Sequence, residues 1–283
     1  MLAAVTLILA ATTGLQQRTD TTLAAPPGAR LELHNLSGTV QVDTWNRAEI
    51  RVRAEHGSRD RIRIEVHGGV IRVQADRRRG EPGDIDYNVT VPQTMGVDVG
   101  GTDTDVTVES VGGDLRVESV DGDVTVRNAG GAVLVTSTEG DIQVDGGRGT
   151  IRINGIEGDV GISRARGEIT VETVEGDVTL DDVESGNVDI STVEGDIVYR
   201  GTVQDSGNYR LTTHEGDVTL AVATPLDATV SVATFEGSFE AAPAFGVTLS
   251  PGRHGSRRSF VVGNGAARIE LESFEGAIRL ERR

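Results

Sequence analysis

Apolar and polar residues alternate along most of the chain, in short runs separated by glycine-containing turns. Alternation with a period of two is typical of β-strands, whose successive side chains point to opposite faces. In the segment 174–180, the pattern predicts an inner face of Val174, Gly176, Val178 and Leu180 and an outer face of Glu175, Asp177 and Thr179. Because residues 100–240 show no apolar stripe with helical spacing, we expect a succession of strands without crossover helices.

Glycine recurs every nine residues from Gly113 to Gly176, and the nine-residue units alternate between two types. The first type reads Ser or Thr, any residue, an acid, Gly, usually Asp, and then alternating apolar residues. Its copies are SVDGDVTV (119–126), STEGDIQV (137–144), TVEGDVTL (173–180), TVEGDIVY (192–199), THEGDVTL (213–220), and, without the Asp, TFEGSFEA (234–241) and SFEGAIRL (273–280). The second type is looser, as in GGAVLV (130–135) and RGEITV (166–171). Two unlike halves predict two unlike faces.

A nine-residue unit has room for one short strand and a corner, but not for a helix that could connect parallel strands. The chain must therefore coil on itself, with each strand stacked in parallel on its equivalent one coil earlier. This predicts an all-β fold, a parallel β-solenoid with about 18 residues per coil in two nine-residue halves. We expect about nine coils and a rod about 40 Å long. The predicted interior columns are Ile142, Val160, Val178, Ile197 and Val218, and Val144, Ile162, Leu180, Tyr199 and Leu220.

Small residues mark the predicted corners of each coil. Glycine is expected where the turn leaves no room for a side chain or needs a positive φ. A ladder of hydroxyl residues precedes it, with Gly155 as the exception: Ser119, Ser137, Thr173, Thr192, Thr213, Thr234 and Ser273. We interpret these residues as structural.

The pattern divides the chain into three parts. Residues 1–25 are expected to be a signal peptide or N-terminal export segment, and residues 26–99, which contain alternating runs and hairpin turns, an antiparallel β cap. Residues 100–283 are expected to form the β-solenoid, with a looped C-terminal closing coil after an interruption of the period at 250–265. Both ends of a parallel stack need covering because unpaired strand edges aggregate.

The export segment is predicted from an apolar run at residues 2–11 (LAAVTLILAA). Its length suits the core of a signal peptide and is too short to span a bilayer. No Lys or Arg precedes it, and small residues near Gly14 and near Ala24 and Ala25 both allow cleavage. A buried strand or a disordered tail is the alternative. We expect an extracytoplasmic protein (periplasmic, cell-surface or secreted) without a further transmembrane anchor.

Charge is distributed unevenly along the chain. The formal net charge is −17, but residues 30–80 carry +4, residues 81–249 carry −24 and residues 250–283 carry +3. The middle is therefore an acidic rod between mildly basic ends, which argues against nucleic-acid binding and would permit staggered self-association.

Composition excludes several kinds of chemistry. The chain has no cysteine and only 3% aromatic residues, so thiolate metal sites, cysteine nucleophiles and aromatic sugar-stacking clefts are not expected. The five histidines (His34, His56, His67, His214 and His254) are scattered singly, without metal-ligand spacing. We therefore predict no catalytic residue, no cofactor-binding residue and no enzymatic activity.

The acids of the first repeat type form two expected columns on one outer face. They are Glu139, Asp141, Glu157, Asp159, Glu175, Asp177, Glu194, Asp196, Glu215 and Asp217. Calcium would relieve repulsion along such columns, so this ladder is the candidate site for a divalent cation or a glycan. The favoured interpretation is a solvated acidic face that keeps the rod soluble, because a flat ladder supplies few of the six to eight oxygens that Ca²⁺ needs.

The repeated Ser/Thr-x-Glu-Gly-Asp-Val-x-Leu signature, preceded by the strand pair SGTVQVDTWNRAEIRVRA (37–54), resembles the bacterial putative-adhesin family over roughly residues 30–283. The resemblance implies an exported β-solenoid with an adhesive or interaction role, and it assigns no site residues. We expect a non-catalytic surface or scaffold protein whose partner is an unidentified protein or a cell-envelope glycan, with calcium or glycan binding on the ladder as the alternative. A polysaccharide-active β-helix enzyme is a remote third hypothesis.

Overall fold

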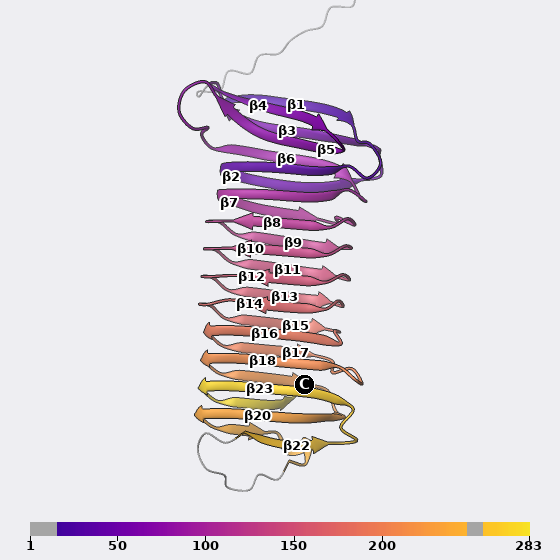
Figure 1. The fold of residues 1–283 in the computed structure, drawn as a ribbon, viewed down its shortest axis with the longest axis vertical. Helices are drawn as coiled ribbons and strands as arrows, with labels where there is room; N and C mark the ends of the chain where they lie inside the picture. The colour runs from indigo at the N-terminus through magenta and orange to yellow at the C-terminus, as the bar shows by residue number, and fades with distance from the viewer. Residues whose placement is uncertain (1–15, 248–256) are drawn as a thin grey trace, which may run out of the picture.

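The computed structural model describes residues 16–247 and 257–283, which form a long rod of stacked β-strands (Figure 1). Each regular coil contributes one strand to a first face and one to a second face. The first face contains β8 (Leu115–Ser119), β10 (Val133–Ser137), β12 (Ile151–Asn154), β14 (Ile169–Glu172), β16 (Asn187–Glu194) and β18 (Asn208–Glu215). The second contains β9 (Val124–Ala129), β11 (Ile142–Gly147), β13 (Val160–Ala165), β15 (Val178–Val183), β17 (Ile197–Gly201) and β19 (Val218–Val222). The predicted β-solenoid is confirmed.

Strands of successive coils pair in parallel, and the two predicted interior columns are confirmed. Val178 of β15 lies between Val160 of β13 and Ile197 of β17, and all three are buried. Leu180 lies likewise between Ile162 and Tyr199. The narrow interior is filled mainly by Val, Ile and Leu side chains from both faces, so apolar burial holds the rod together along its whole length.

The expected position of Val174 is wrong. The alternation assigned it to the inner face, but its side chain is 42% exposed because residues 173–177 form the corner between β14 and β15, outside either strand. The period-two rule holds only while the backbone stays extended, and the corner interrupts it.

The corner glycine is required for two independent reasons. Gly176 has φ +123°, a conformation that residues with a Cβ rarely adopt. A Cβ there would also lie 2.2 Å from the carbonyl oxygen of Gly158 in the preceding coil. The hydroxyl of Thr173 donates to the Glu175 carbonyl at 3.5 Å, and the Ser119, Ser137, Thr192 and Thr213 hydroxyls donate to the equivalent carbonyls of their coils. The structural interpretation of these columns is confirmed.

The N-terminal region is more solenoid-like than expected. β2 (Arg30–Trp45) and β7 (Gly96–Glu109) each run through both faces as complete coils, and they pair with each other in parallel. On the outer side of β2 lie β5 (Val70–Arg77) and β6 (Ile85–Pro92), also in parallel. The antiparallel pairing expected for residues 26–99 occurs only beyond them, where β4 (Asp60–His67) covers β5 and β3 (Glu49–Gly57) covers β6.

The expected division of the chain differs from the strands at two places. Residues 16–24, which the sequence assigned to the export segment, form β1 (Gln16–Ala24), antiparallel to β3 at the end of the second face. β7 runs across the expected boundary at residues 99 and 100. Residues 1–15 lie outside the described residues.

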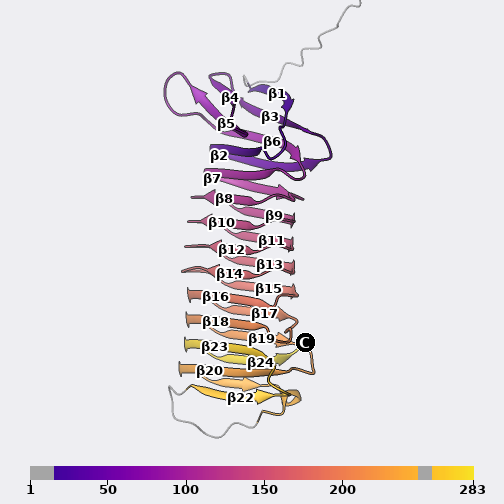
Figure 2. The same ribbon diagram turned by 45° about the vertical axis from the view of Figure 1, so that its right-hand side comes forward.

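The C-terminal coil does not close the rod, contrary to the expectation. β20 (Ala228–Glu236) and β21 (Phe239–Ala241) form the last coil in space, followed by the short 3₁₀ helix η1 (Pro243–Phe245) and by β22 (Arg258–Val262), antiparallel to β20. The final strands, β23 (Ala267–Glu275) and β24 (Ile278–Arg282), lie inside the stack. β23 pairs in parallel with both β18 and β20, and β24 pairs with both β19 and β21 (Figures 1 and 2). With β2 and β7 counted as one coil each, and β5 and β6 not counted, the described residues form ten coils, close to the expected nine.

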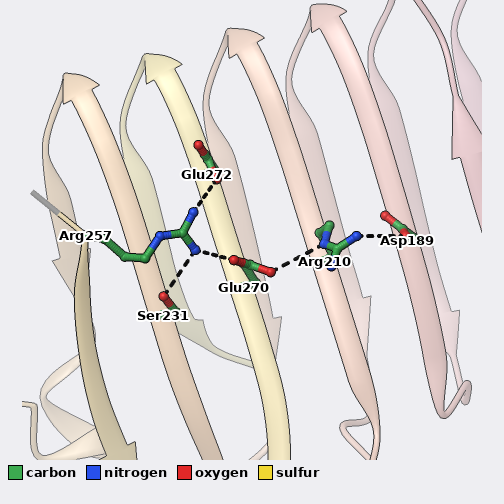
Figure 3. A network of polar contacts seen from close by, with 6 residues as sticks. All are labelled: Asp189, Arg210, Ser231, Arg257, Glu270 and Glu272. Carbon is green, nitrogen blue, oxygen red and sulfur yellow. Dashed lines mark hydrogen bonds and ion pairs between the residues drawn. The ribbon is translucent and has the colours of Figure 1, made fainter. Parts of the chain in front are cut away.

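Ion pairs cross the first face around the inserted strand (Figure 3). Glu270 of β23 accepts from Arg210 of β18 at 3.4 Å and from Arg257, which also pairs with Glu272 at 2.8 Å. Arg210 reaches Asp189 of β16 at 3.5 Å. Arg257 and Arg210 together hold the pKa of Glu270 below its usual range, against the opposing effect of burial. The network thus connects the inserted strand with the coils before it and with the residue that leads into β22.

At the corner directly before β19, Asp217 connects β24 with the coil before it. It accepts the Ala277 backbone N–H at 2.7 Å and pairs with Arg279 at 2.7 Å. The hydrogen bond from Ala277, with a further contribution from Arg279, holds the pKa of Asp217 below its usual range, against the effect of partial burial.

We expect Val178→Asp to unfold the protein or to lower the free energy of unfolding by more than about 4 kcal/mol, because it buries an unpaired carboxylate among stacked side chains. Thr179→Asp, on the outer face of the same strand, should cost about 1 kcal/mol or less. Urea unfolding followed by circular dichroism measures both. Similar losses in the two variants would contradict the assigned faces.

The protein should lose stability as the pH falls through about 4, because the carboxylates of Asp217 and Glu270 have lower pKa values in the folded than in the unfolded chain. The unfolded chain then takes up protons first, so the contribution of these groups is complete above about pH 5 and lost below. Asp217→Asn should flatten this dependence in urea titrations from pH 7 to 3. Asp205→Asn, which alters an exposed carboxylate without a hydrogen bond or ion pair to a described residue, should leave it unchanged.

Candidate functional site

The candidate site is the acidic corner, the column of Ser/Thr-x-Glu-Gly-Asp segments between the first and second faces. It contains all ten acids of the predicted ladder, and the structure stacks them as expected. Glu157, Glu175 and Glu194 lie on successive coils, joined by backbone bridges. Their side chains are exposed, and none forms an ion pair with a described residue.

The sequence suggested that the Asp column is a solvated face, but its carboxylates also accept backbone hydrogen bonds between coils. Asp177 accepts the backbone N–H of Asp196 in the next coil at 2.8 Å, while its own N–H donates to Asp159 at 2.9 Å. The same bond recurs along the rod, with the acceptors Asp105, Asp123, Asp141, Asp159, Asp177, Asp196 and Asp217. Each carboxylate therefore satisfies a backbone donor that the turn would otherwise leave without a protein partner.

An exposed apolar column lies beside the acids, at the x position of the motif. We name it the corner ridge. The strand register aligns ten positions along it: Leu36, Thr102, Val120, Thr138, Ile156, Val174, Val193, His214, Phe274 and Phe235. Seven of these are large apolar residues, each between 41% and 52% exposed. At a strand spacing of about 4.8 Å the ridge is about 43 Å long.

The C-terminal end of the corner ridge is aromatic. The ring of Phe274 stacks on Phe235 with a centroid distance of 4.8 Å and on His214 with a distance of 4.7 Å. The inserted strand β23 supplies Phe274, so the stack exists only because that strand lies between β18 and β20. Both faces of the Phe274 ring are covered by its neighbours, and its edge remains open to solvent.

The ladder does not assemble a metal site in the part of the chain that the structure describes. There, no three His, Asp or Glu side chains converge in a way that could hold an ion. One oxygen of each Asp in the ladder already accepts a backbone N–H, which leaves few oxygens for a cation that prefers six to eight. Calcium binding therefore stays a prediction that this geometry does not favour.

The opposite corner of the coils, between the second face and the first face of the next coil, has a different character. It forms a groove of about 510 Å³ lined by Arg148, Arg164 and Arg166 among glycines and small polar residues. Arg164 pairs with Asp145, and Arg166 pairs with Glu184 at 3.1 Å. Local acids thus compensate most of the positive charge of this groove, whereas Glu157, Glu175 and Glu194 beside the corner ridge form no ion pair with a described residue.

The corner ridge is the feature that sequence reasoning missed. The x position counted as any residue, although its occupants in the motif copies include Val120, Val174, Val193, Phe235 and Phe274. A preference for large apolar residues at a corner, outside both strands, was the available signal. The period-two alternation obscures this preference, because it places Val174 in the interior.

The fold and the site define an elongated β-solenoid whose most distinctive surface is an acidic and apolar corner. The chain belongs to the Toastrack DUF4097 family, whose model matches residues 29–281. No curated protein matches the sequence. A solved structure of a "putative cell adhesion protein" from Clostridium sporogenes ATCC 15579 is 10% identical, with 95% of this chain and 100% of that chain covered and a TM-score of 0.24. At that TM-score the likeness supports no argument about the present chain.

Among residues 16–247 and 257–283, no helix is long and apolar enough to cross a bilayer.

We expect Asp177→Ala to lower the free energy of unfolding by about 1 kcal/mol, because the backbone N–H of Asp196 loses its protein acceptor. Glu175→Ala is the matched control, since it removes a carboxylate from the same corner that accepts no hydrogen bond from a described residue; its effect should stay within about 0.5 kcal/mol. Urea titration measures the difference, and equal values would show that the Asp column is only a solvated face.

Proposed function

We propose that the protein is a non-catalytic extracytoplasmic interaction module that binds another protein of the cell envelope along the corner ridge. One observation carries the proposal: seven of the ten positions of the corner ridge carry large apolar side chains that stay exposed, from Leu36 at one end of the ridge to Phe235 at the other. Contiguous exposed apolar surface is uncommon on proteins without a partner and is typical of interaction sites. Membership of the Toastrack DUF4097 family is compatible with this role and specifies no activity.

The corner itself does not need these apolar side chains. Thr138 and His214 occupy the same column, with the same strand pairing as Ile156 and Val193. The bends are supported instead by the corner glycines, the hydroxyl ladder and the Asp column. A large apolar residue at the x position therefore contributes little to folding, which supports a role in binding.

The charge beside the ridge defines the partner. Glu157, Glu175 and Glu194 form no ion pairs with described residues, so a complementary surface combines apolar residues with Arg or Lys. A second copy docked through the same corner would bring like charges together and is disfavoured. A glycan stacked on an aromatic face is disfavoured too, because both faces of Phe274 are covered by protein rings.

The test is a double variant in the middle of the ridge, Val174→Asp with Val193→Asp. The control is Thr136→Asp with Gln143→Asp, which adds the same charge at exposed strand positions that flank the corner segment 137–141 but do not belong to the ridge. Immobilised wild type and control should retain the same proteins from a native envelope fraction, and the ridge variant should lose at least about 90% of this binding, as expected when an apolar contact is replaced by charge.

Unfolding midpoints of the three proteins check that the folds are equal. Retention of the same proteins by the ridge variant, or an equal loss in the control, would contradict binding along the ridge.

A further inference from the structure

Five arginines line one open concavity at the N-terminal tip of the rod. Arg59 and Arg61 come from the turn before β4 and from its beginning, and residues 77–79 from the end of β5 and the loop that follows. With Ser58 they enclose about 780 Å³. The positive charge of this concavity is opposite in sign to the charge of the rest of the rod, where residues 81–249 carry a net charge of −24.

A buried carboxylate organises the concavity. Asp60 is 2% exposed and accepts two hydrogen bonds from Arg77, at 2.6 Å from Nε and 3.1 Å from Nη2. The chain makes room for this pair with glycine, because a Cβ at Gly57 would lie 2.8 Å from the Asp60 carboxylate. The pair connects the two segments that supply the arginines, so these two segments are held in a fixed position relative to each other.

The remaining four arginines carry uncompensated charge. Arg59, Arg61, Arg78 and Arg79 are exposed and form no ion pair with a described residue. The segments outside the description contain no Asp or Glu that could neutralise them. Guanidinium groups match phosphate oxygens in charge and in paired hydrogen-bond geometry, so phosphate is the chemistry that this cluster fits.

The course of the chain indicates where the phosphate comes from. Gln16, the first residue of β1, pairs with Gly57, next to Ser58 and Arg59. Only residues 12–15 separate Gln16 from the apolar run 2–11. This connecting segment spans at most about 18 Å when fully extended. In the uncleaved chain, with the apolar run inserted in a bilayer, the arginines are within reach of the headgroups.

We propose that this arginine cluster binds the phosphate groups of an anionic bilayer surface and sets the rod upright on it. The tip is attracted by the anionic surface, and the acidic shaft is repelled by it, so the two effects orient the molecule in the same sense. The corner ridge then extends away from the membrane along the rod.

The test uses the full chain and co-sedimentation with vesicles of phosphatidylcholine, with or without about 30 mol% phosphatidylglycerol. The tip variant is Arg78→Gln with Arg79→Gln. The control is Arg152→Gln with Arg268→Gln, which removes the same charge from exposed shaft positions without ion pairs to described residues. The apolar run is identical in all three proteins, so it cannot produce a difference between them.

Wild type and control should bind the anionic vesicles equally, and the tip variant about 30-fold more weakly, as expected for the loss of two cationic side chains at an anionic surface. About 0.5 M NaCl should abolish the difference. Equal binding to neutral vesicles, an equal loss in the control, or a salt-insensitive difference would overturn the proposal. So would inorganic polyphosphate binding without vesicle binding, or self-association of the protein alone that accounts for the pelleted material.

Discussion

The stack depends on the close approach of successive backbones at the acidic corner. At Gly176 the carbonyl oxygen of the preceding coil occupies space that a Cβ would need, and the next residue donates its N–H to the carboxylate of the coil before. Glycine and aspartate thus have complementary roles in the packing of successive coils. Glycine lets the coils approach to hydrogen-bonding distance, and aspartate satisfies the backbone donor that the bend turns outward.

Once the coils are held at this spacing, surface properties are repeated along the rod. A residue type that recurs at one position of the motif becomes a column, whether it is an exposed valine or an unpaired glutamate. A weak preference in each coil thereby becomes a long surface of uniform chemistry, which suits an extended partner better than a compact ligand. The two ends break the repeat, and the arginine-lined tip lies at one of them.

Local spacing predicts the middle of the fold well and the ends poorly. The columns through Val178 and Leu180 follow from an 18-residue period, because each strand pairs with its sequence neighbour one coil away. The positions of β2 and β23 could not be derived in this way. β2 pairs with β5, β6 and β7, which carry no copy of the repeat motif near it in sequence, and β23 lies between β18 and β20, whose motif copies follow each other directly in the sequence. The corner ridge was hidden because Val174 obeys the alternation in sequence while lying outside the strand. For the arginines of the tip, the sequence predicts only the net positive charge of residues 30–80. It does not predict the cluster, because residues 59–61 and 77–79 come together through the pairing of β4 with β5.

The position of β23 and β24 also determines when the rod can be finished. These strands fill a gap that is bordered on one side by β18 and β19 and on the other by β20 and β21, and they come later in the chain than all four of these neighbours. Until residues 267–282 are available, the strands on both sides of the gap have unpaired edges, and the stack of His214, Phe274 and Phe235 lacks its central ring. The rod therefore cannot assemble coil by coil from one end to the other. A chain truncated before residue 267 lacks the coil between β18/β19 and β20/β21, and the strands on both sides of this gap keep unpaired edges.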